Sequence, residues 1–514
     1  MTGNKPALRF NFYNFFISCF VCLGIFFIFA RLADLKLITA DGSFYLSTAE
    51  NIADHKGFVV DFNIYQAFNT LYHPLWAYCQ PLYPVFCSLF IKHGGIATVI
   101  LVNILFFALN MMLIFYIVQG LMPTLFNLLF ISTLVLSLQT FITATYPLTE
   151  QFYFFCFMVT FILFLKFKDR RGPLFWLGVL NGVFMLIRVA HLFNFLAYVP
   201  VLFLDKGSRL EKFKRASAFA GGFILAYGLY QLFCLWKYHV FYPEYAWPAV
   251  NYTLARHYSG LVYELGRVGS LVPQPHISLS RHLVYSWRNL LIFLHLMPVF
   301  IFPAFFYYFL PIKKRAGGML MELCYFQAIF TVLGYSATLN GLSMLSFEYY
   351  RYSMIPFIFI SIAGWYCLYQ GLSFLGPRLQ KSFVLIVLLI LILPLYHKFA
   401  SYVSMLENRP LAVRLYFKDL REGYGWIAGH LPEKVLVASN EDQQGYFMHR
   451  PYISTPVGRS FNCANLAVFN RIYSPNYYFL SREVSDKCFE AIPHSLVFSN
   501  RIFRLLKVTD DKLD

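Results

Sequence analysis

The residues of this sequence best suited to chemistry are a few ionisable side chains inside or beside long apolar runs. Asp41 follows the first apolar run, and Glu150 opens another in TYPLTEQFYFF. Arg188 lies in FMLIRVAH, and Arg351 lies in SFEYYRYSMIP. Ionisable residues are costly in a bilayer, so those that occur there usually mark a functional site. Carboxylates and arginines gathered at one membrane face can serve a reacting hydroxyl and a lipid phosphate together.

Each of these residues also has a structural interpretation. Asp41 precedes a helical pattern, where its carboxylate would cap free backbone N–H groups. Either arginine could extend to lipid headgroups, and Arg351 could pair with the nearby Glu348. The convergence of the four sites on one membrane face is the stronger argument, and it depends on the topology of the chain.

The elements that must position these residues are predicted to be membrane-spanning helices. Hydrophobic residues make up 59% of the 514 residues, and charged residues only 13%, about half the usual share. A soluble globule cannot hide that much apolar surface. The composition therefore excludes a soluble protein, a disordered chain and a disulfide scaffold, and it predicts many spans of roughly 20 residues each.

We predict an α-helical polytopic membrane protein whose membrane domain covers residues 1–398. Its eleven predicted spans are 12–32, 97–118, 123–141, 149–165, 174–190, 191–204, 218–240, 288–310, 319–337, 353–375 and 382–398. Residues 81–94 are expected to form a helix at the outer interface. Residues 399–514 regain charge and carry short β-branched runs between Pro and Gly, so we expect a small mixed α/β domain there.

The net charge of +17 is explained by orientation in the membrane. Residues 399–514 hold 14 Lys/Arg and 12 Asp/Glu, so the basic surplus lies in residues 1–398. Sixteen basic residues fall on the side of the membrane that holds the N-terminus, in clusters such as 166–171 and 206–215, which places that side in the cytoplasm. The first outer loop, 33–96, and the C-terminal domain then lie outside the cytoplasm. Nucleic acid is not expected as a partner.

A series of short motifs runs through nearly the whole chain. It comprises D-x3-Y-x3-A-x7-G (Asp41, Tyr45, Ala49, Gly57), HPLWAYCQPLYP, Pro-x2-Glu (Pro147, Glu150), G-x5-R (Gly182, Arg188), RY-x3-P (Arg351, Tyr352, Pro356) and WI-x4-P (Trp426, Ile427, Pro432). In this order the motifs resemble the GT-C class of integral-membrane glycosyltransferases. The likeness is greatest to bacterial relatives of protein O-mannosyltransferases and of the lipid A aminoarabinose transferase.

The resemblance implies an inverting transfer of a sugar from a polyprenyl-phosphate donor to an acceptor hydroxyl at the outer face of the cytoplasmic membrane. The acceptor would be a glycan, a lipid or a protein. Asp41 matches the general base of the class, and Arg351 and Arg188 are expected to bind the donor phosphate. The remaining expected site residues are Glu150, which would position the acceptor or an arginine, together with His73 and Tyr45, which would line the pocket.

No metal ion or other cofactor is expected. Several relatives carry a second acidic residue directly after the catalytic Asp, whereas Gly42 follows Asp41 here.

Two other functions suit a chain of this composition: a transporter or flippase, and a polysaccharide polymerase or ligase of the cell envelope. A transporter usually shows internal repeats, which the sequence lacks. A polymerase or ligase usually lacks an Asp-bearing loop directly after its first span.

Overall fold

In a computed structural model, the chain divides into two compact units. Unit 1 comprises Met1–Leu35, Val99–His239 and Leu271–Ser404, and unit 2 comprises Lys36–Thr98, Val240–Ser270 and Met405–Asp514. The structure describes residues 12–33, 40–58, 62–63, 80–188, 191–204, 208–238, 318–338, 347–373, 393–407, 411–439, 445–450, 452–454, 474–484 and 492–509, with the single residues 287, 291, 382, 466, 470 and 489. Every structural statement below concerns these residues.

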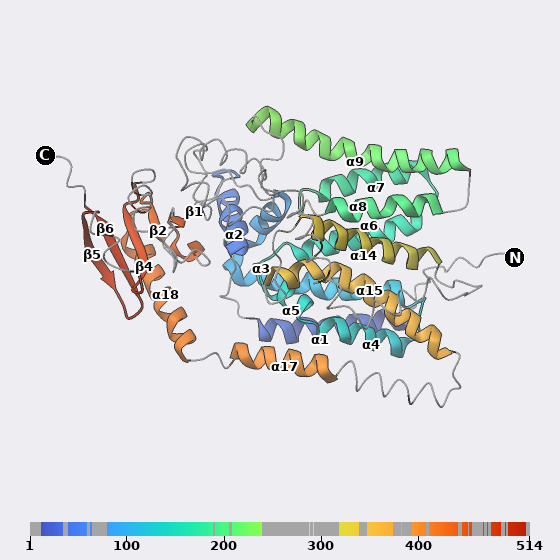
Figure 1. Ribbon diagram of the computed structural model, residues 1–514, viewed down its shortest axis with the longest axis horizontal. Coiled ribbons are helices and arrows are strands. Elements are labelled where there is room, and N and C mark those ends of the chain that lie inside the picture. The colour runs from blue at the N-terminus through green and yellow to red at the C-terminus, as the bar shows by residue number, and fades with distance from the viewer. Residues whose placement is uncertain are drawn as a thin grey trace. The chain divides into compact units, whose positions relative to one another are not determined.

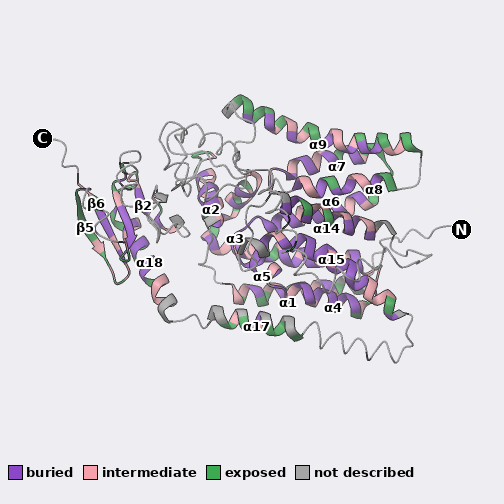
Figure 2. Cartoon of the chain, viewed as in Figure 1, coloured by how far each residue is buried: buried purple, intermediate pink, exposed green. Residues whose placement is uncertain are grey.

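Unit 1 is a bundle of apolar helices (Figure 1). Its elements are α1 (Phe12–Leu32), the later part of α3 (Leu82–Val118), α4 (Thr124–Val135), α5 (Leu138–Thr145), α6 (Glu150–Phe167), α7 (Arg171–Phe184), α8 (His191–Leu204), α9 (Arg209–Tyr238), α14 (Gly318–Thr338), α15 (Phe347–Ser373) and most of α17 (Leu393–Glu407). The buried residues of the bundle face its interior, and α9 carries many exposed ones (Figure 2). Exposed apolar side chains on α9, such as Trp236, suit contact with lipid.

Four described helices are long and apolar enough to cross a membrane: Leu82–Val118, Glu150–Phe167, Arg209–Trp236 and Arg351–Leu372. The bent pair Thr124–Val135 and Gln139–Thr145, with an angle of 63°, makes at most a fifth span. The prediction of an α-helical membrane protein is therefore confirmed. The count of eleven spans stays a prediction, because most of the predicted spans 288–310 and 382–398 lies outside the described residues.

Two glycines interrupt α3. Gly95 has φ 60° and ψ −145°, a backbone conformation that favours a residue without a Cβ atom. The break at Gly94 and Gly95 falls at the predicted boundary between the interfacial helix 81–94 and the span 97–118. The sequence therefore placed this boundary correctly.

Helices α7 and α9 pack backbone against backbone. A Cβ atom added at Gly178 would overlap the carbonyl group of Phe219, and one added at Gly182 would overlap the carbonyl oxygen of Phe223. On the other side, a Cβ atom at Gly222 would overlap the carbonyl oxygen of Phe175. Small residues at a helix interface allow this close approach, which compensates for the weak hydrophobic drive between helices in lipid.

Unit 2 contains a six-stranded mixed sheet, in the order β1-β3-β2-β4-β6-β5. The strands are β1 (Phe62–Asn63), β2 (Val437–Ser439), β3 (Tyr452–Ser454), β4 (Tyr477–Ser481), β5 (His494–Ser499) and β6 (Phe503–Val508). Neighbouring strands from β1 to β4 are parallel, whereas β6 is antiparallel to both β4 and β5. In β1, which comes from the first loop, Phe62 pairs with Tyr452 of β3.

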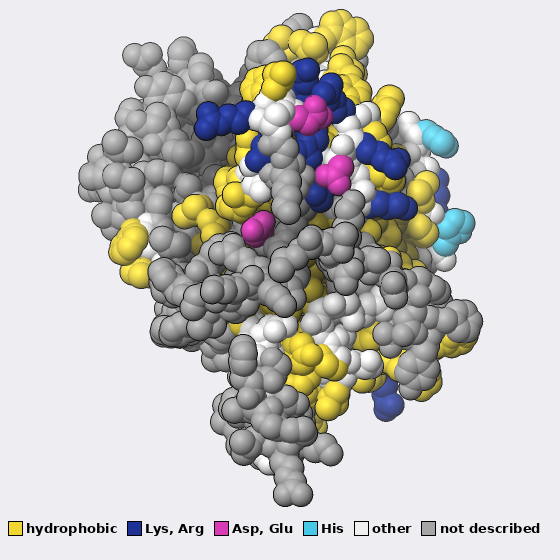
Figure 3. Space-filling model, turned by 90° about the vertical axis from the view of Figure 1, so that its right-hand side faces the viewer, with side chains coloured by type: hydrophobic (Ala, Val, Ile, Leu, Met, Phe, Trp, Pro, Cys, Tyr) yellow, Lys and Arg dark blue, Asp and Glu magenta, His cyan; other side chains and the backbone are white. Residues whose placement is uncertain are grey.

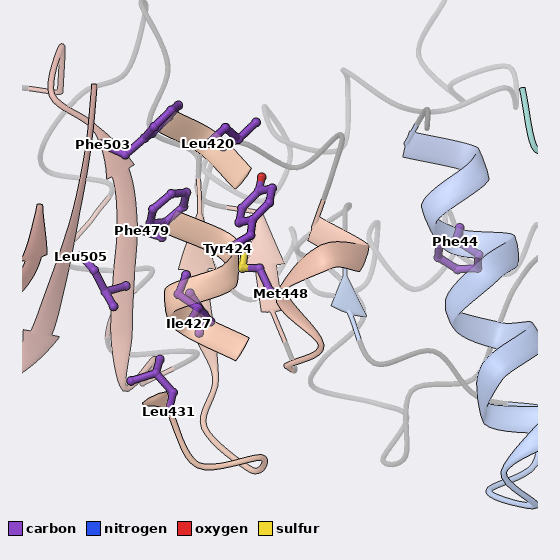
Figure 4. Close-up of a cluster of buried hydrophobic side chains, with 10 residues drawn as sticks. Phe44, Leu420, Tyr424, Ile427, Leu431, Met448, Phe479, Phe503 and Leu505 are labelled. Carbon is purple, nitrogen blue, oxygen red and sulfur yellow. The ribbon is translucent and has the colours of Figure 1, made fainter. Parts of the chain in front are cut away.

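Helix α18 (Leu411–His430) packs on this sheet through one apolar face. Leu420, Tyr424 and Ile427 follow the helical spacing of apolar residues and belong to one buried cluster with Phe479 and Phe503 (Figure 4). The same buried cluster includes Phe44 of α2 (Ala40–Ala53). Among the described residues, α18 and strands β2 to β6 come from the tail, and the unit also takes residues from the first loop. A separate C-terminal domain over 399–514 stays a prediction.

Candidate functional site

Glu150, Arg188 and Arg351 form a buried ion cluster in unit 1. Glu150 begins α6, Arg351 lies near the start of α15, and Arg188 lies in the turn after α7. The Nε group of Arg351 donates to Glu150 Oε1 at 2.7 Å, and Nη1 of Arg188 donates to the same oxygen. The side chains of Glu150, Arg188 and Arg351 are 3%, 11% and 6% exposed. Sequence reasoning identified all three residues, and the structure brings them together.

The cluster combines two cations with one anion, so its formal charge is +1. Arg188 also donates to Thr149 Oγ1 at 3.1 Å, again through Nη1. An arginine offers five N–H donors, and within the described residues Arg188 makes its hydrogen bonds through Nη1 alone. The remaining donors and the surplus positive charge make the cluster suited to bind an anion with several acceptor oxygens, such as a phosphate.

Tyr352 is a member of this site to which the sequence assigned no role. Its ring centroid lies 5.3 Å from Cζ of Arg188 and 5.8 Å from Cζ of Arg351. A tyrosine ring at this distance attracts a guanidinium electrostatically. The ring also packs against Tyr335 of α14, with a centroid distance of 5.0 Å. The signal in the sequence was the place of Tyr352 in the RY-x3-P motif, directly after a membrane arginine.

Asp41 and Tyr45 lie on α2, in unit 2. The helix begins at Ala40, so Asp41 lies within its first turn. Asp41 is therefore not the N-cap residue, which is the residue that precedes the helix. A carboxylate there interacts favourably with the free N–H groups of the helix start, and Asp41 is partly exposed. Tyr45, one turn later, packs edge-on against Tyr83 with ring centroids 5.3 Å apart.

Several other expected residues cannot be placed. His73 lies outside the described residues, and of Glu348 only the backbone is described. The ionic partner found for Arg351 is Glu150, which is 201 positions away.

Among the described residues, no group of three or more His, Cys, Asp or Glu is arranged to hold a metal ion. A transfer without a metal ion remains a prediction.

The basic clusters lie at the other end of α6 from Glu150. Helix α6 runs for 18 residues, about 27 Å at 1.5 Å per residue. Beyond its far end, Asp169 pairs with Lys168 at 3.2 Å and with Arg215 at 3.4 Å, and Arg171 pairs with Glu211. Figure 3 shows Lys and Arg side chains gathered on one face of the molecule. The ion cluster and these basic residues therefore mark opposite ends of the bundle.

Comparison with protein-family models and with curated proteins gives no match. Three solved structures are similar in fold, each at 12% identity. ArnT from Cupriavidus metallidurans, bound to undecaprenyl phosphate, has a TM-score of 0.54 over 96% of this chain and 98% of its own. The oligosaccharyltransferase of Archaeoglobus fulgidus, tethered with an acceptor peptide, has a TM-score of 0.52 over 95% of this chain and 74% of its own. The mycobacterial arabinofuranosyltransferase AftD has a TM-score of 0.53 over 98% of this chain and 40% of its own.

These likenesses concern the fold. All three proteins are GT-C glycosyltransferases, and their similarity extends over nearly the whole of this chain. The chain is an integral membrane protein with the GT-C fold. This confirms the fold that the order of short motifs predicted.

Proposed function

We propose that this protein is a membrane glycosyltransferase that moves a sugar from a polyprenyl-phosphate donor to an acceptor hydroxyl. The single observation that carries the proposal is the buried cluster of two arginines on one carboxylate, set in a GT-C fold. A site with two guanidinium groups inside an apolar bundle is suited to a phosphate that is attached to a lipid chain. The solved ArnT structure holds undecaprenyl phosphate, a ligand of this chemical kind.

Arg188 and Arg351 are proposed to bind the donor phosphate. When the bond between the anomeric carbon and the phosphate oxygen breaks, negative charge grows on the departing lipid phosphate. Fixed guanidinium groups stabilise that charge without reorganising. Glu150 accepts from both arginines and so fixes their orientation, which gives it the role of positioning its partner arginines.

Asp41 is proposed to act as the general base. The acceptor oxygen attacks the anomeric carbon from the face opposite the phosphate, and its proton passes to the Asp41 carboxylate. One C–O bond forms as the other breaks, so the configuration inverts. Tyr45 follows Asp41 by one turn on the same face of α2 and would line the acceptor pocket. His73 is a candidate for the lining of the donor pocket.

The proposed site faces the outside of the cytoplasmic membrane. The basic residues at the far end of α6 would lie in the cytoplasm by the positive-inside rule, which puts Glu150 at the outer leaflet. The N-terminus would then be cytoplasmic and the C-terminal domain extracytoplasmic. The acceptor is a glycan, lipid or protein hydroxyl, and the sugar is a hexose or a pentose.

Transfer assays and glycan profiling test this function. Purified protein in lipid nanodiscs is mixed with polyprenyl-phosphate sugars, and released undecaprenyl phosphate is measured. In parallel, surface glycans and lipids of a deletion strain are compared by mass spectrometry with those of the parent. We expect loss of one sugar modification, restored by the unaltered gene and not by a variant with Asp41→Asn. Movement of the donor across the membrane without transfer would instead establish a flippase.

A further inference from the structure

A second polar layer lies one helical turn deeper in unit 1 than Glu150. Five side chains there are fully buried, with an exposed fraction of 0% each: Tyr153, Asn181, His191, Asn194 and Thr331. They come from α6, α7, α8 and α14, and none has a part in the transfer described above. Burying a polar group costs free energy unless the group is hydrogen-bonded, so we expect these five side chains to have hydrogen-bond partners.

Both ring nitrogens of His191 have a hydrogen-bond partner. The amide nitrogen of Asn181 donates to the carbonyl oxygen of Leu177 at 2.7 Å, so Asn181 Oδ1 faces the imidazole, 2.8 Å from His191 Nε2. His191 Nδ1 lies 3.0 Å from the hydroxyl of Tyr153. A neutral imidazole with its proton on Nε2 satisfies both bonds: Nε2 donates to Asn181, and Tyr153 donates to Nδ1.

Asn194 extends the layer to α14. Its amide nitrogen donates to the Tyr153 hydroxyl, and its Oδ1 accepts from Thr331 at 2.9 Å. Its backbone oxygen accepts from Gln327 at 3.0 Å. The Tyr153 hydroxyl thus both donates and accepts, and one hydrogen-bond chain connects α7, α8, α6 and α14.

The spacing links this layer to the ion cluster. Tyr153 follows Glu150 by three residues on α6, and His191 follows Arg188 by three residues. The backbone N–H of His191 also donates to the carbonyl oxygen of Arg188 at 3.0 Å. Helix α6 is therefore bonded to Arg188, in the turn after α7, and to His191, at the start of α8.

We propose that His191 and Tyr153 are positioning residues, which fix the turn that carries Arg188 so that its guanidinium meets a lipid phosphate in one orientation. The inference rests on the proposed function, because it assigns a purpose to the placement of Arg188. Charged binding groups must be held to within a fraction of an ångström by the groups behind them. His191 and Tyr153 provide that support through hydrogen bonds without touching the ligand.

Binding of undecaprenyl phosphate tests the role of the Tyr153 hydroxyl. Tyr153→Phe removes one oxygen and preserves the ring, and we expect the Kd to rise about threefold to tenfold, the effect of losing a neutral buried hydrogen bond. The matched control is Tyr198→Phe: Tyr198 is also fully buried, and its hydroxyl lies 3.4 Å from Thr160, away from His191. The control should leave the Kd unchanged, and both variants should unfold at similar temperatures.

A double-mutant cycle separates positioning from general stability. In an Arg188→Gln background, Tyr153→Phe should have no further effect on the Kd, because the group that it positions is gone. The same rise in Kd in both backgrounds would overturn the proposal, as would an equal rise in the Tyr198→Phe control or no rise at all. If Tyr153→Phe fails to fold, Asn181→Leu breaks the other bond of the imidazole and is measured in the same cycle.

The two proposals fail in different ways. If Arg188→Gln weakens binding and neither Tyr153→Phe nor Asn181→Leu does, the positioning role is wrong and the phosphate site stands. If the unaltered protein binds undecaprenyl phosphate no better than Arg188→Gln does, the phosphate site is wrong, and the positioning role is refuted with it.

Discussion

The carboxylates of Asp41 and Glu150 lie in contrasting surroundings. Glu150 is buried, and one of its oxygens accepts from two arginines at the start of α6. Asp41 lies in the first turn of α2, partly exposed to solvent. A carboxylate that accepts from two guanidinium groups is a poor proton acceptor, whereas a partly exposed carboxylate outside such a cluster is better suited to that role. The difference supports the proposal that Glu150 orients the arginines and that Asp41 acts as the general base.

The contrast is tested most directly by Asp41→Asn. We expect kcat to fall by roughly a hundredfold to ten-thousandfold, the typical contribution of a general base, with the melting temperature nearly unchanged. Asp54→Asn is the matched control, because Asp54 directly follows the same helix and forms exposed ion pairs with Lys56 and Lys92. Normal turnover in Asp41→Asn would show that the base is another group.

Glu150→Gln should show the opposite pattern, a large loss of stability. The substitution removes the carboxylate that both guanidinium groups share, and breaking a buried ion pair in this way costs about 3–5 kcal/mol. Thermal unfolding in detergent measures the effect. Glu211→Gln is the control: Glu211 pairs with Arg171, but its side chain is 41% exposed, so its loss should hardly change the melting temperature. Similar melting temperatures for both variants would contradict the organising role of Glu150.

Arg351→Ala tests whether the ion cluster around Glu150 binds the donor phosphate. Loss of a charged hydrogen-bond donor should raise the apparent KM for the polyprenyl-phosphate sugar by about 10- to 100-fold, measured in steady-state transfer assays. Arg351→Lys keeps the charge and loses the planar guanidinium group, so its KM should lie between that of the unaltered protein and that of Arg351→Ala. An unchanged KM in Arg351→Ala would make this arginine purely structural.

Removal of divalent metal ions should have the smallest effect. Asp41 is followed by Gly42, so the first loop offers no adjacent pair of carboxylates for a metal ion. We expect the transfer rate in excess EDTA to equal that of the untreated enzyme. A loss of activity that Mg²⁺ or Mn²⁺ restores would overturn this expectation.

The members of the site were more predictable than their pairing. Charged residues in apolar runs are rare, so Glu150, Arg188 and Arg351 stood out at once. Their contacts join residues 38 and 201 positions apart and depend on how the helices pack, which periodicity does not encode. The predicted span 174–190 also differs from the structure, because α7 ends at Phe184 and Arg188 lies in the following turn.

The sheet of unit 2 was predictable only in part. Apolar and β-branched runs in the tail indicated strands, and β2 to β6 are found there. Strand β1 has two residues, too few to show an alternating pattern. Its place beside β3 comes from tertiary contact alone.

The pairing of β1 with β3 sets a parity rule for the membrane domain. Phe62 and Tyr452 are neighbours in one sheet, so the first loop and the tail must lie on the same side of the bilayer. The chain between them can cross the membrane only an even number of times. Ten of the eleven predicted spans fall in this interval, an even number. Any other number of membrane crossings between Phe62 and Tyr452 must therefore also be even.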